Sequence, residues 1–349
     1  MHSSEVIIAG GGVAGLSIAL ALRSRGAGVV ILERGTPGRE ASSAAAGMLA
    51  AADPETPSAL RPLALKSARL YSGWVEGLEA VSRSKVDFRR TGSIVIGEQH
   101  PPEEYLKLSP EELRRVESGL NPRGHDAFFV ADNSIDPELL MLALVKAAKM
   151  AGVEVRTGIT VQSVRQSASQ VEVSTDQGLF TAKTAVNCMG AWSGAPVKPR
   201  KGQMLYVQAS PSVSLEHVVR TPGAYLVPRS SGKILIGTTV EDVGFDKSVN
   251  ADTIRTMHQA AARYVPALAS ARVIDSWAGL RPGSPDDLPL IGPTNERNVF
   301  LASGLFRNGI LLAPAVAEVV AAMVMGEAID SDMAPFAPSR FASAKLTRQ

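Results

Sequence analysis

Three glycines near the start of the sequence have the spacing of a phosphate-binding loop. Gly10, Gly12 and Gly15 form a G-x-G-x-x-G pattern directly after the β-branched run 5–9. In such a loop the first glycine allows a tight turn, the second lets backbone N–H groups approach a pyrophosphate, and the third lets a helix lie close to a sheet. The N-terminus of that helix adds partial positive charge, which favours phosphate. The pattern therefore predicts dinucleotide binding.

An acidic residue stands where such a site needs one. The β-branched run 29–32 predicts a second strand, and Glu33 closes it, 18 residues after Gly15. A carboxylate at that distance commonly accepts hydrogen bonds from the ribose hydroxyls of a bound dinucleotide. Two simpler interpretations are a glycine-rich turn without a ligand and a surface ion pair of Glu33 with Arg34. The complete order of strand, loop, helix, strand and acid favours dinucleotide binding.

The helices that would position this loop follow from the pattern of apolar residues. The stretch 16–25 runs without a breaker and ends at Gly26, which predicts a helix with a glycine stop. Asp136 is a good N-cap and Pro137 suits the first helical position, so a second helix is expected from there to residue 150. Both helices are expected to pack on a sheet that includes the two strands.

Mainly β material interrupts these βαβ signals twice, at 86–131 and 199–276. This order is typical of a nucleotide-binding domain combined with a second, discontinuous domain built on a sheet. Where the chain crosses repeatedly between two domains, a cofactor is expected in the cleft between them.

The composition bounds the function further. Of 349 residues, 45% are hydrophobic and 20% charged, which indicates a packed globular protein. The formal net charge is +2, so the sequence gives no broad basic face for nucleic acid. The single cysteine excludes an internal disulfide and a thiolate metal site, and the five histidines show no metal spacing. We expect no metal and no nucleic-acid partner.

Targeting signals and membrane spans are not expected. No cationic segment or small-residue cleavage site precedes the first apolar run. The apolar stretch 6–22 is interrupted by glycines, and the stretch 310–325 contains Pro314 and Glu318. A buried helix is the better interpretation of the later stretch. These features and the single cysteine predict a cytoplasmic protein.

Four segments, in order along the chain, carry a family resemblance. The first is 42–49, read as SSAAAGML, where small side chains let a helix start approach a bulky ligand or a neighbouring helix. The others are 225–239, 279–293 and 302–314. In these segments the chain resembles the amino-acid oxidase superfamily with the D-amino acid oxidase fold, most closely the glycine oxidases of bacterial thiamine biosynthesis.

The resemblance implies non-covalent FAD and a mixed α/β fold. A Rossmann-like FAD-binding domain is expected at 1–85, 132–198 and 277–349. A discontinuous substrate domain with an antiparallel sheet is expected at 86–131 and 199–276.

The expected cofactor contacts combine the glycine loop, the acid, the small-residue segment and later strand and helix ends. They are Gly10, Gly12, Val13, Ala14, Gly15, Glu33, Arg34, Ser42, Ser43, Ala46, Gly47, Met48, Val161, Gly190, Trp192, Gly304, Arg307, Asn308, Gly309, Ile310 and Leu311. Gly309 is expected to open the last helix, whose N–H groups would stabilise negative charge on the reduced flavin. Trp192 is interpreted as packing rather than stacking on flavin. Cys188 lies outside the segment where sarcosine oxidases attach flavin, so a buried, inert thiol is expected.

The same resemblance assigns the substrate contacts. In such an amine oxidase a hydride passes from the carbon bearing the amine to flavin N5, and the protein mainly orients the substrate. Arg281 matches the arginine that binds the substrate carboxylate, a task suited to a bidentate guanidinium. Tyr225 matches a tyrosine that reaches the same carboxylate, and Arg307 an arginine beside flavin and substrate. The alternatives are an ion pair of Arg281 with Asp286 or Asp287, a core tyrosine and a surface arginine.

Four positions depart from the family pattern and leave the substrate open. Leu305 stands where histidine is common, Gly223 where the residue is polar or bulky, Ala50 where glycine can stand, and Val240 where a larger pocket residue is expected. Glycine, sarcosine or small D-amino acids are the expected substrates, oxidised by oxygen to an imine and then a 2-oxo acid, with ammonia and hydrogen peroxide.

Two rival functions are a D-amino acid dehydrogenase that passes electrons to a quinone and a flavin-binding subunit without turnover. In the resembled family the imine feeds the thiazole ring of thiamine. A homo-oligomer is a further expectation from the resemblance.

Overall fold

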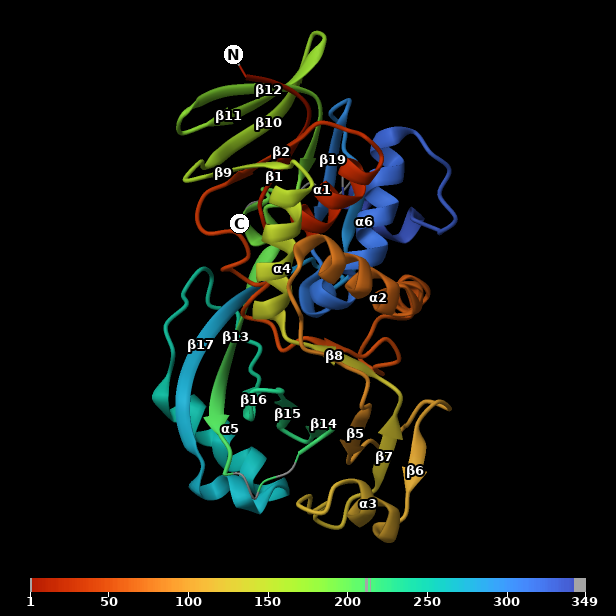
Figure 1. Ribbon diagram of the computed structural model, residues 1–349, viewed down its shortest axis with the longest axis vertical. Coiled ribbons are helices and arrows are strands. Elements are labelled where there is room, and N and C mark those ends of the chain that lie inside the picture. The colour runs from red at the N-terminus through yellow and green to blue at the C-terminus, as the bar shows by residue number, and fades with distance from the viewer. Residues whose placement is uncertain (1, 211–212, 214, 342–349) are drawn as a thin grey trace.

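A computed structural model describes residues 2–210, 213 and 215–341 of the chain. It contains two large sheets, one covered by helices and one largely antiparallel, stacked along the long axis of the molecule (Figure 1). The expected mixed α/β class is confirmed.

The first sheet joins strands from both ends of the chain. Its order is β10-β11-β12-β1-β2-β9, with β19 beside β12 and β18 beside β19. The pairs that link β9, β2, β1, β12 and β19 are parallel. The strand bounds are β1 His2–Ala9, β2 Val29–Glu33, β9 Glu154–Thr157, β10 Val161–Ser167, β11 Gln170–Thr175, β12 Gly178–Asn187, β18 Leu290–Pro293 and β19 Val299–Ser303. The parallel arrangement brings several strand ends to one edge.

Four helices pack with this sheet in one large apolar core. They are α1 Val13–Ser24, α2 Arg61–Ser82, α4 Pro137–Met150 and α6 Gly309–Met325. Asp136 caps α4 as expected, since its carboxylate accepts from the N–H groups of Glu138 and Leu139. Within the described residues, the apolar stretch Phe306–Met325 is long enough to cross a membrane, but 67% of its most apolar window is buried inside the protein.

A proline inside α6 is accommodated by the helix beside it. Pro314 has no N–H and therefore leaves the Ile310 carbonyl without its helical donor. The hydroxyl of Tyr71, a fully buried residue of α2, donates to that carbonyl at 2.9 Å. Ser67 Oγ, one turn away, donates to the Leu311 carbonyl and accepts from the N–H of Ala315. Helix α2 thus fixes the first turns of α6.

The second sheet has the order β17-β13-β16-β15-β14-β5-β7-β6 and is antiparallel except for the β14–β5 pair. Its strands are β5 Ser93–Ile96, β6 Leu106–Leu108, β7 Ala127–Val130, β13 Lys198–Gln208, β14 Val218–Thr221, β15 Ala224–Pro228, β16 Lys233–Gly237 and β17 Arg272–Gly283. Helix α5 (Ala251–Tyr264) packs on it in a second core, and the short helix α3 (Pro110–Val116) lies at its far end. Strand β17 stays in this sheet to Gly283, beyond residue 276, and the domain boundaries stay a proposal.

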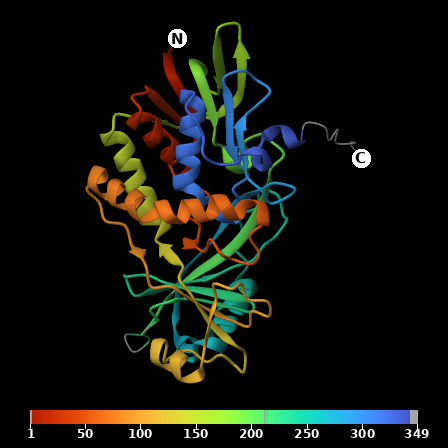
Figure 2. The same cartoon turned by 90° about the vertical axis from the view of Figure 1, so that its right-hand side faces the viewer.

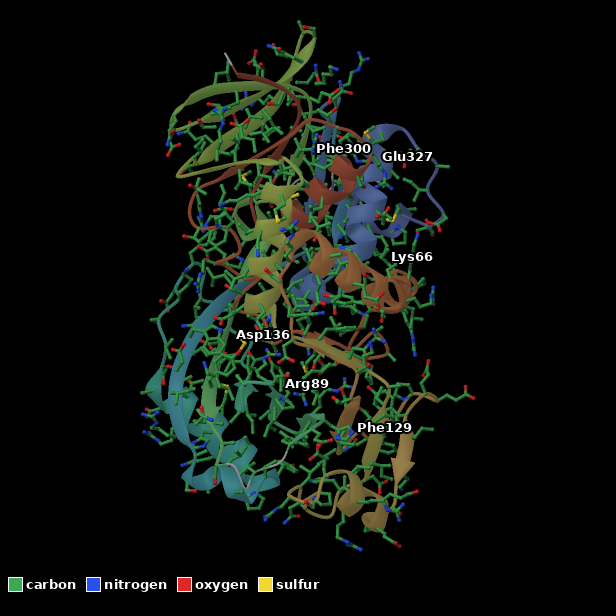
Figure 3. All side chains as sticks on the ribbon, in the orientation of Figure 1. Lys66, Arg89, Phe129, Asp136, Phe300 and Glu327 are labelled. Atoms are coloured by element: carbon green, nitrogen blue, oxygen red, sulfur yellow. The ribbon has the colours of Figure 1, made fainter. Side chains whose placement is uncertain are left out.

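A small sheet of β3 (Met48–Leu49), β8 (Asn133–Ile135) and β4 (Phe88–Arg89) lies at the junction, and the turned view in Figure 2 shows the long α2 crossing just above it. The buried Arg229 donates to the carbonyls of Ile135 and Ala46 there. It also lies 3.7 Å from Asp136, which Figure 3 labels at the junction. These contacts hold the 46–49 segment against the second sheet.

Candidate functional site

A cavity of about 370 Å³ lies between the two sheets. On one side it meets the carboxyl ends of β1, β2, β12 and β19, because residues at or just beyond each of these ends line it. On the other side it meets β13 and β17 through Met204 and the run 279–282. Open α/β sheets bind ligands in this position, and the volume is in the range of known small-molecule sites.

Most of the expected site residues line this one cavity. They are Gly10, Gly12, Val13, Ala14, Glu33, Arg34, Ser42, Ala46, Gly47, Met48, Val161, Gly190, Trp192, Tyr225, Arg281, Arg307, Gly309 and Ile310. Five others do not line it: Gly15, Ser43, Gly304, Asn308 and Leu311. Leu311 points into the core and is 2% exposed, while Gly15 lies behind the loop against the backbone of Gly10.

The glycine loop is as tight as its sequence suggests. Gly10 has φ +103°, and a Cβ there would lie 2.6 Å from the carbonyl oxygen of Cys188. A Cβ on Gly15 would lie 2.0 Å from the Gly10 carbonyl oxygen, so only glycine lets α1 approach the loop. At the start of α1 the N–H of Val13 donates to Ser42 Oγ at 3.0 Å. The loop and the 42–48 segment thereby form one wall.

Glu33 is held at the end of β2 by backbone donors. Its two carboxylate oxygens accept from the N–H of Gly11 at 2.7 Å and of Gly35 at 2.8 Å. The alternative ion pair with Arg34 is not formed. Arg34 instead pairs with Glu40 at 2.7 Å, and its guanidinium lies 3.7 Å from the centre of the Trp192 ring. Trp192 thus packs against Arg34 at the rim of the cavity.

These residues fit FAD. The cavity extends from Glu33 past the glycine loop to Arg281, which suits a long dinucleotide rather than a single small ligand. A Cβ on Gly12 would approach Ser42 Oγ to 3.2 Å, so the absence of a side chain keeps this approach to α1 clear. Helix α6 begins at Gly309 with no side-chain cap, which leaves N–H groups at the cavity wall for an acceptor.

At the opposite end from Glu33, Arg281 presents a cation without an acidic partner. Its Nη1 donates to the Thr239 carbonyl at 3.1 Å and its Nη2 to Thr238 Oγ1 at 2.8 Å. No Asp or Glu in the described part of the chain pairs with it. The ion pair weighed for Arg281 is therefore wrong, since Asp286 pairs with Arg340 at 2.9 Å. Burial lowers the pKa of Arg281, but a guanidinium stays charged.

Tyr225 lies beside this guanidinium. Burial raises the pKa of the Tyr225 phenol, and the neighbouring Arg281 and Thr238 act in the opposite direction. A phenol with a raised pKa stays protonated at neutral pH and can donate a hydrogen bond. A Cβ on Gly237 would lie 2.7 Å from the Tyr225 hydroxyl, so this glycine makes room for the ring.

Arg307 lines the same cavity from the turn before α6 but is more exposed. Its side chain is 40% exposed and pairs with Glu55, which lies in the loop after β3. It is close enough to Arg281 to lower the pKa of that guanidinium. Three arginines thus line one cavity, Arg34, Arg281 and Arg307, and among the described residues only Arg281 has no carboxylate partner.

Sequence reasoning missed Gly202, which makes room for the site: a Cβ on this residue of β13 would lie 2.1 Å from Arg281 Nη1. Gly279 is expected at a close approach beside the flavin, and a Cβ there would lie 2.7 Å from the Ala44 Cβ. A glycine inside a strand is the available signal for such close approach. Cys188 lines the cavity, and burial raises the pKa of its thiol, which suits an inert side chain.

Comparison with known proteins assigns the chain to a family. The family described as FAD dependent oxidoreductase matches residues 5–323. The chain belongs to this family. Its members depend on FAD, in agreement with the cavity, and the resemblance seen in the sequence is confirmed.

Individual relatives cover the chain to different extents. The bifunctional protein ThiO/ThiG of Trichormus variabilis is 35% identical over 97% of this chain, which spans only 55% of that relative. The hydrogen cyanide synthase subunit HcnC of Pseudomonas aeruginosa is 33% identical, with 97% of this chain and 96% of that protein covered. The crystal structure of glycine oxidase from Geobacillus kaustophilus superposes with a TM-score of 0.91 at 32% identity, covering 97% and 99% of the two chains. The chain therefore has the same overall fold as that glycine oxidase.

Proposed function

We propose that this protein oxidatively deaminates small amino acids, with glycine, sarcosine and small D-amino acids as the substrate class. The observation that carries the proposal is the partly buried guanidinium of Arg281, which has no acidic partner among the described residues and faces the cavity beside Tyr225. A buried unpaired cation is costly, and a bound carboxylate would compensate it. The reaction converts the amine and oxygen to an imine and hydrogen peroxide, and water then releases a 2-oxo acid and ammonia or an amine.

Each end of the cavity has its own task in this proposal. FAD, bound non-covalently, supplies the two-electron acceptor. The loop from Gly10 to Ala14, with Glu33, Ser42 and Met48, would hold it through backbone donors and close packing. Arg281 and Tyr225 would fix the substrate carboxylate by charge-assisted hydrogen bonds and so orient the carbon that loses the hydride.

Three uncharged side chains in the cavity lining bear on the substrate class. Met48 and Met204 line the cavity, and Leu305 places an aliphatic side chain where the resembled family commonly has histidine. The amine must be neutral to be oxidised, and none of these three groups carries a charge that would hold it protonated. This supports substrates with uncharged side chains.

A substrate panel tests the proposal. The purified flavoprotein is mixed anaerobically with glycine, sarcosine and D-alanine, and the flavin absorbance is followed; bleaching with at least one of them is expected. Oxygen uptake and hydrogen peroxide are then measured with the best substrate. Rapid bleaching without oxygen uptake would favour a quinone-dependent dehydrogenase. A flavin spectrum that stays unchanged with all three amines would favour a non-catalytic flavin-binding subunit.

We further propose that the imine product serves formation of the thiamine thiazole, which the similarity to bifunctional ThiO/ThiG proteins supports. Expression of the chain in a bacterium that lacks its own oxidase for this step is expected to restore growth without thiamine. Failure to restore growth, by an enzyme that oxidises glycine in the same cells, would argue against this role.

A further inference from the structure

The guanidinium of Arg281 is held by two threonines that are themselves held from behind. Thr238 Oγ1, which accepts from Arg281, donates to the Gln203 carbonyl at 3.1 Å. The Thr239 carbonyl accepts a hydrogen bond from Arg281. The Thr239 hydroxyl accepts one from the backbone N–H of Gln203 at 3.1 Å. The same hydroxyl donates to Glu241 Oε1 at 2.5 Å. Both threonines therefore bond to Gln203, and Thr239 also bonds to Glu241.

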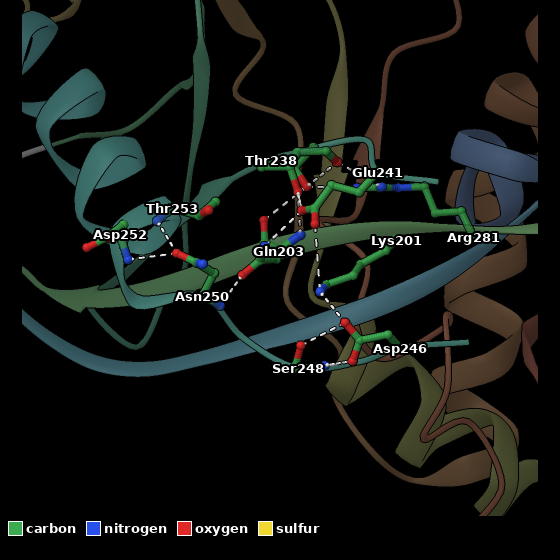
Figure 4. Close-up of polar contacts among 11 residues, drawn as sticks. Lys201, Gln203, Thr238, Glu241, Asp246, Ser248, Asn250, Asp252, Thr253 and Arg281 are labelled. Carbon is green, nitrogen blue, oxygen red and sulfur yellow. Dashed lines mark hydrogen bonds and ion pairs between the residues drawn. The ribbon is translucent and has the colours of Figure 1, made fainter. Parts of the chain in front are cut away.

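Figure 4 shows how this layer continues away from the cavity. Gln203 is 1% exposed, donates through Nε2 to Glu241 Oε1 at 2.8 Å and accepts from the N–H of Asn250 at 2.7 Å. The ammonium of Lys201 lies 3.7 Å from Glu241 Oε2 and 3.3 Å from Asp246 Oδ2. The backbones of Lys201 and Glu241 also bond to each other in both directions at 2.9 Å.

A buried lysine in this place needs an explanation. The Lys201 side chain is 4% exposed, and its strand neighbour across β17 is Leu280, next to Arg281. Desolvation favours the protonated form of Glu241, but the hydrogen bonds from Thr239 and Gln203 and the charge of Lys201 outweigh it and lower the pKa of that carboxyl. Glu241 is thus an ionised acceptor whose charge is matched by Lys201 rather than by Arg281.

We propose that Lys201, Gln203 and Glu241 form a positioning network that fixes the Arg281 guanidinium in its substrate-binding orientation while leaving its charge free for the substrate. This inference rests on the proposed function of Arg281. Lys201 compensates the charge of Glu241, Gln203 holds Thr238 and Thr239, and Glu241 also holds Thr239. The two threonines each accept one hydrogen bond from Arg281. None of the three network residues contacts the substrate in this proposal.

The test removes the acceptor and then restores it. Glu241→Ala is expected to raise KM for the best amine substrate about tenfold, with kcat changed by less than about twofold, because the carboxylate-binding geometry loosens. Calorimetry of the holoenzyme with acetate is expected to show a similar loss of affinity. Glu241→Gln keeps an Oε1 acceptor and is expected to recover most of both values. Lys201→Met is expected to weaken both in the same direction as Glu241→Ala.

Glu117→Ala is the matched control. Glu117 is also a buried carboxylate, 2% exposed, which accepts from the N–H groups of Glu216 and His217 at 2.7 Å, but it does not line the cavity. This variant is expected to lower Tm and to leave KM and acetate affinity unchanged. Normal KM and acetate affinity in folded Glu241→Ala, or an equal rise in KM in the control, would overturn the proposal. If Glu241→Ala does not fold, the KM and acetate affinity of Lys201→Met are compared with those of Glu241→Gln. The proposal then expects weaker values in Lys201→Met, and equal values would overturn it. If the proposed function itself is wrong, the result is different: no amine in the panel reduces the flavin of the parent protein.

Discussion

The two ends of the cavity are built by different means. At the Glu33 end, the donors are backbone N–H groups and the spaces are glycines, all within residues 10–48. At the other end the groups are side chains of Tyr225, Arg281 and Arg307, which reach the cavity from three distant segments. The first end is local in sequence and depends on backbone shape, whereas the second depends on strand register and charge. Substitutions at the Glu33 end should therefore reduce FAD binding, whereas substitutions at the Arg281 end should mainly raise KM.

The largest effect is expected at the backbone end. Gly15→Ala places a Cβ 2.0 Å from the Gly10 carbonyl oxygen, where no flexible side chain can move aside, so the loop must shift. We expect the purified variant to retain little or no FAD, measured as flavin absorbance per polypeptide.

The control for this prediction is Gly77→Ala in α2, where a Cβ meets nothing within 4 Å. It should keep FAD and gain about 0.5–1 kcal/mol of stability, because alanine favours a helix over glycine. Full flavin content in Gly15→Ala would show that the loop tolerates a side chain and would weaken the contrast between the two ends.

The next largest effect is expected at the charged end. Arg281→Ala should leave FAD content near normal and raise KM about ten- to a hundredfold, because a charge-assisted contact contributes about 1.5–3 kcal/mol. Steady-state kinetics with the best amine measures this. Arg340→Ala removes an arginine paired with Asp286 outside the cavity and should keep the parent KM. Unchanged kinetics in Arg281→Ala would remove Arg281 from the site.

A smaller effect should arise without any change in charge. Gly202→Ala places a Cβ 2.1 Å from Arg281 Nη1, the far end of a flexible side chain that can move. The protein should fold, bind FAD and show a KM raised about tenfold by the displaced guanidinium. Gly119→Ala, where a Cβ meets nothing within 4 Å, is the control and should keep the parent KM. A normal KM in Gly202→Ala would mean that register at this end matters less than charge.

The smallest catalytic effect is expected at a buried arginine that has acidic partners. Arg220 lies 2.9 Å from Asp53 and 3.0 Å from Asp132, and burial raises the pKa of Asp132 to about 6. The native state then binds the proton more tightly than the unfolded state, whose carboxyl titrates near 3.8, so the free energy of unfolding falls as pH rises between these values. The fall should be about 3 kcal/mol.

The substitution Asp132→Asn should remove this decrease in the free energy of unfolding and leave KM at the parent value. Denaturant unfolding of parent and variant at several pH values between 4 and 7 measures the first part, because the difference in stability should shift toward the variant as pH rises. Parallel pH profiles of the two proteins would contradict the assignment of this titration to Asp132.

The same contrast explains what could be predicted from the sequence. Gly10, Gly12 and Glu33 follow from spacing because one strand, loop, helix and strand position them, and the structure places them along one wall. The lack of an acidic partner for Arg281 among the described residues could not be predicted, since Asp286 is its nearest acid in sequence. Only the folded chain shows that Asp286 pairs with Arg340, near the other end of the described chain.

Other features depend on contacts that no local pattern carries. Gly202 and Gly237 look like ordinary strand glycines until the folded sheet is seen. The register of β13 with β17 brings Gly202 against Arg281, and that of β15 with β16 brings Gly237 against Tyr225. Among the expected cofactor residues, Leu311 belongs to an apolar helix start in which Gly309 and Ile310 line the cavity and Leu311 is buried in the core. Spacing alone could not separate Ile310, which lines the cavity, from its neighbour.

The hydrogen bond from Tyr71 to Ile310 joins α2 to α6, a helix that is synthesised late, so it bears on when the cavity can close during synthesis. The wall that it stabilises comes from a helix near residue 310, whereas the glycine loop opposite is among the first segments synthesised. A nascent chain can form the early strand, loop and helix but cannot enclose a cofactor until α6 has emerged and docked on α2. We therefore expect cofactor capture to be a late step of biogenesis, and incomplete chains to be released without flavin.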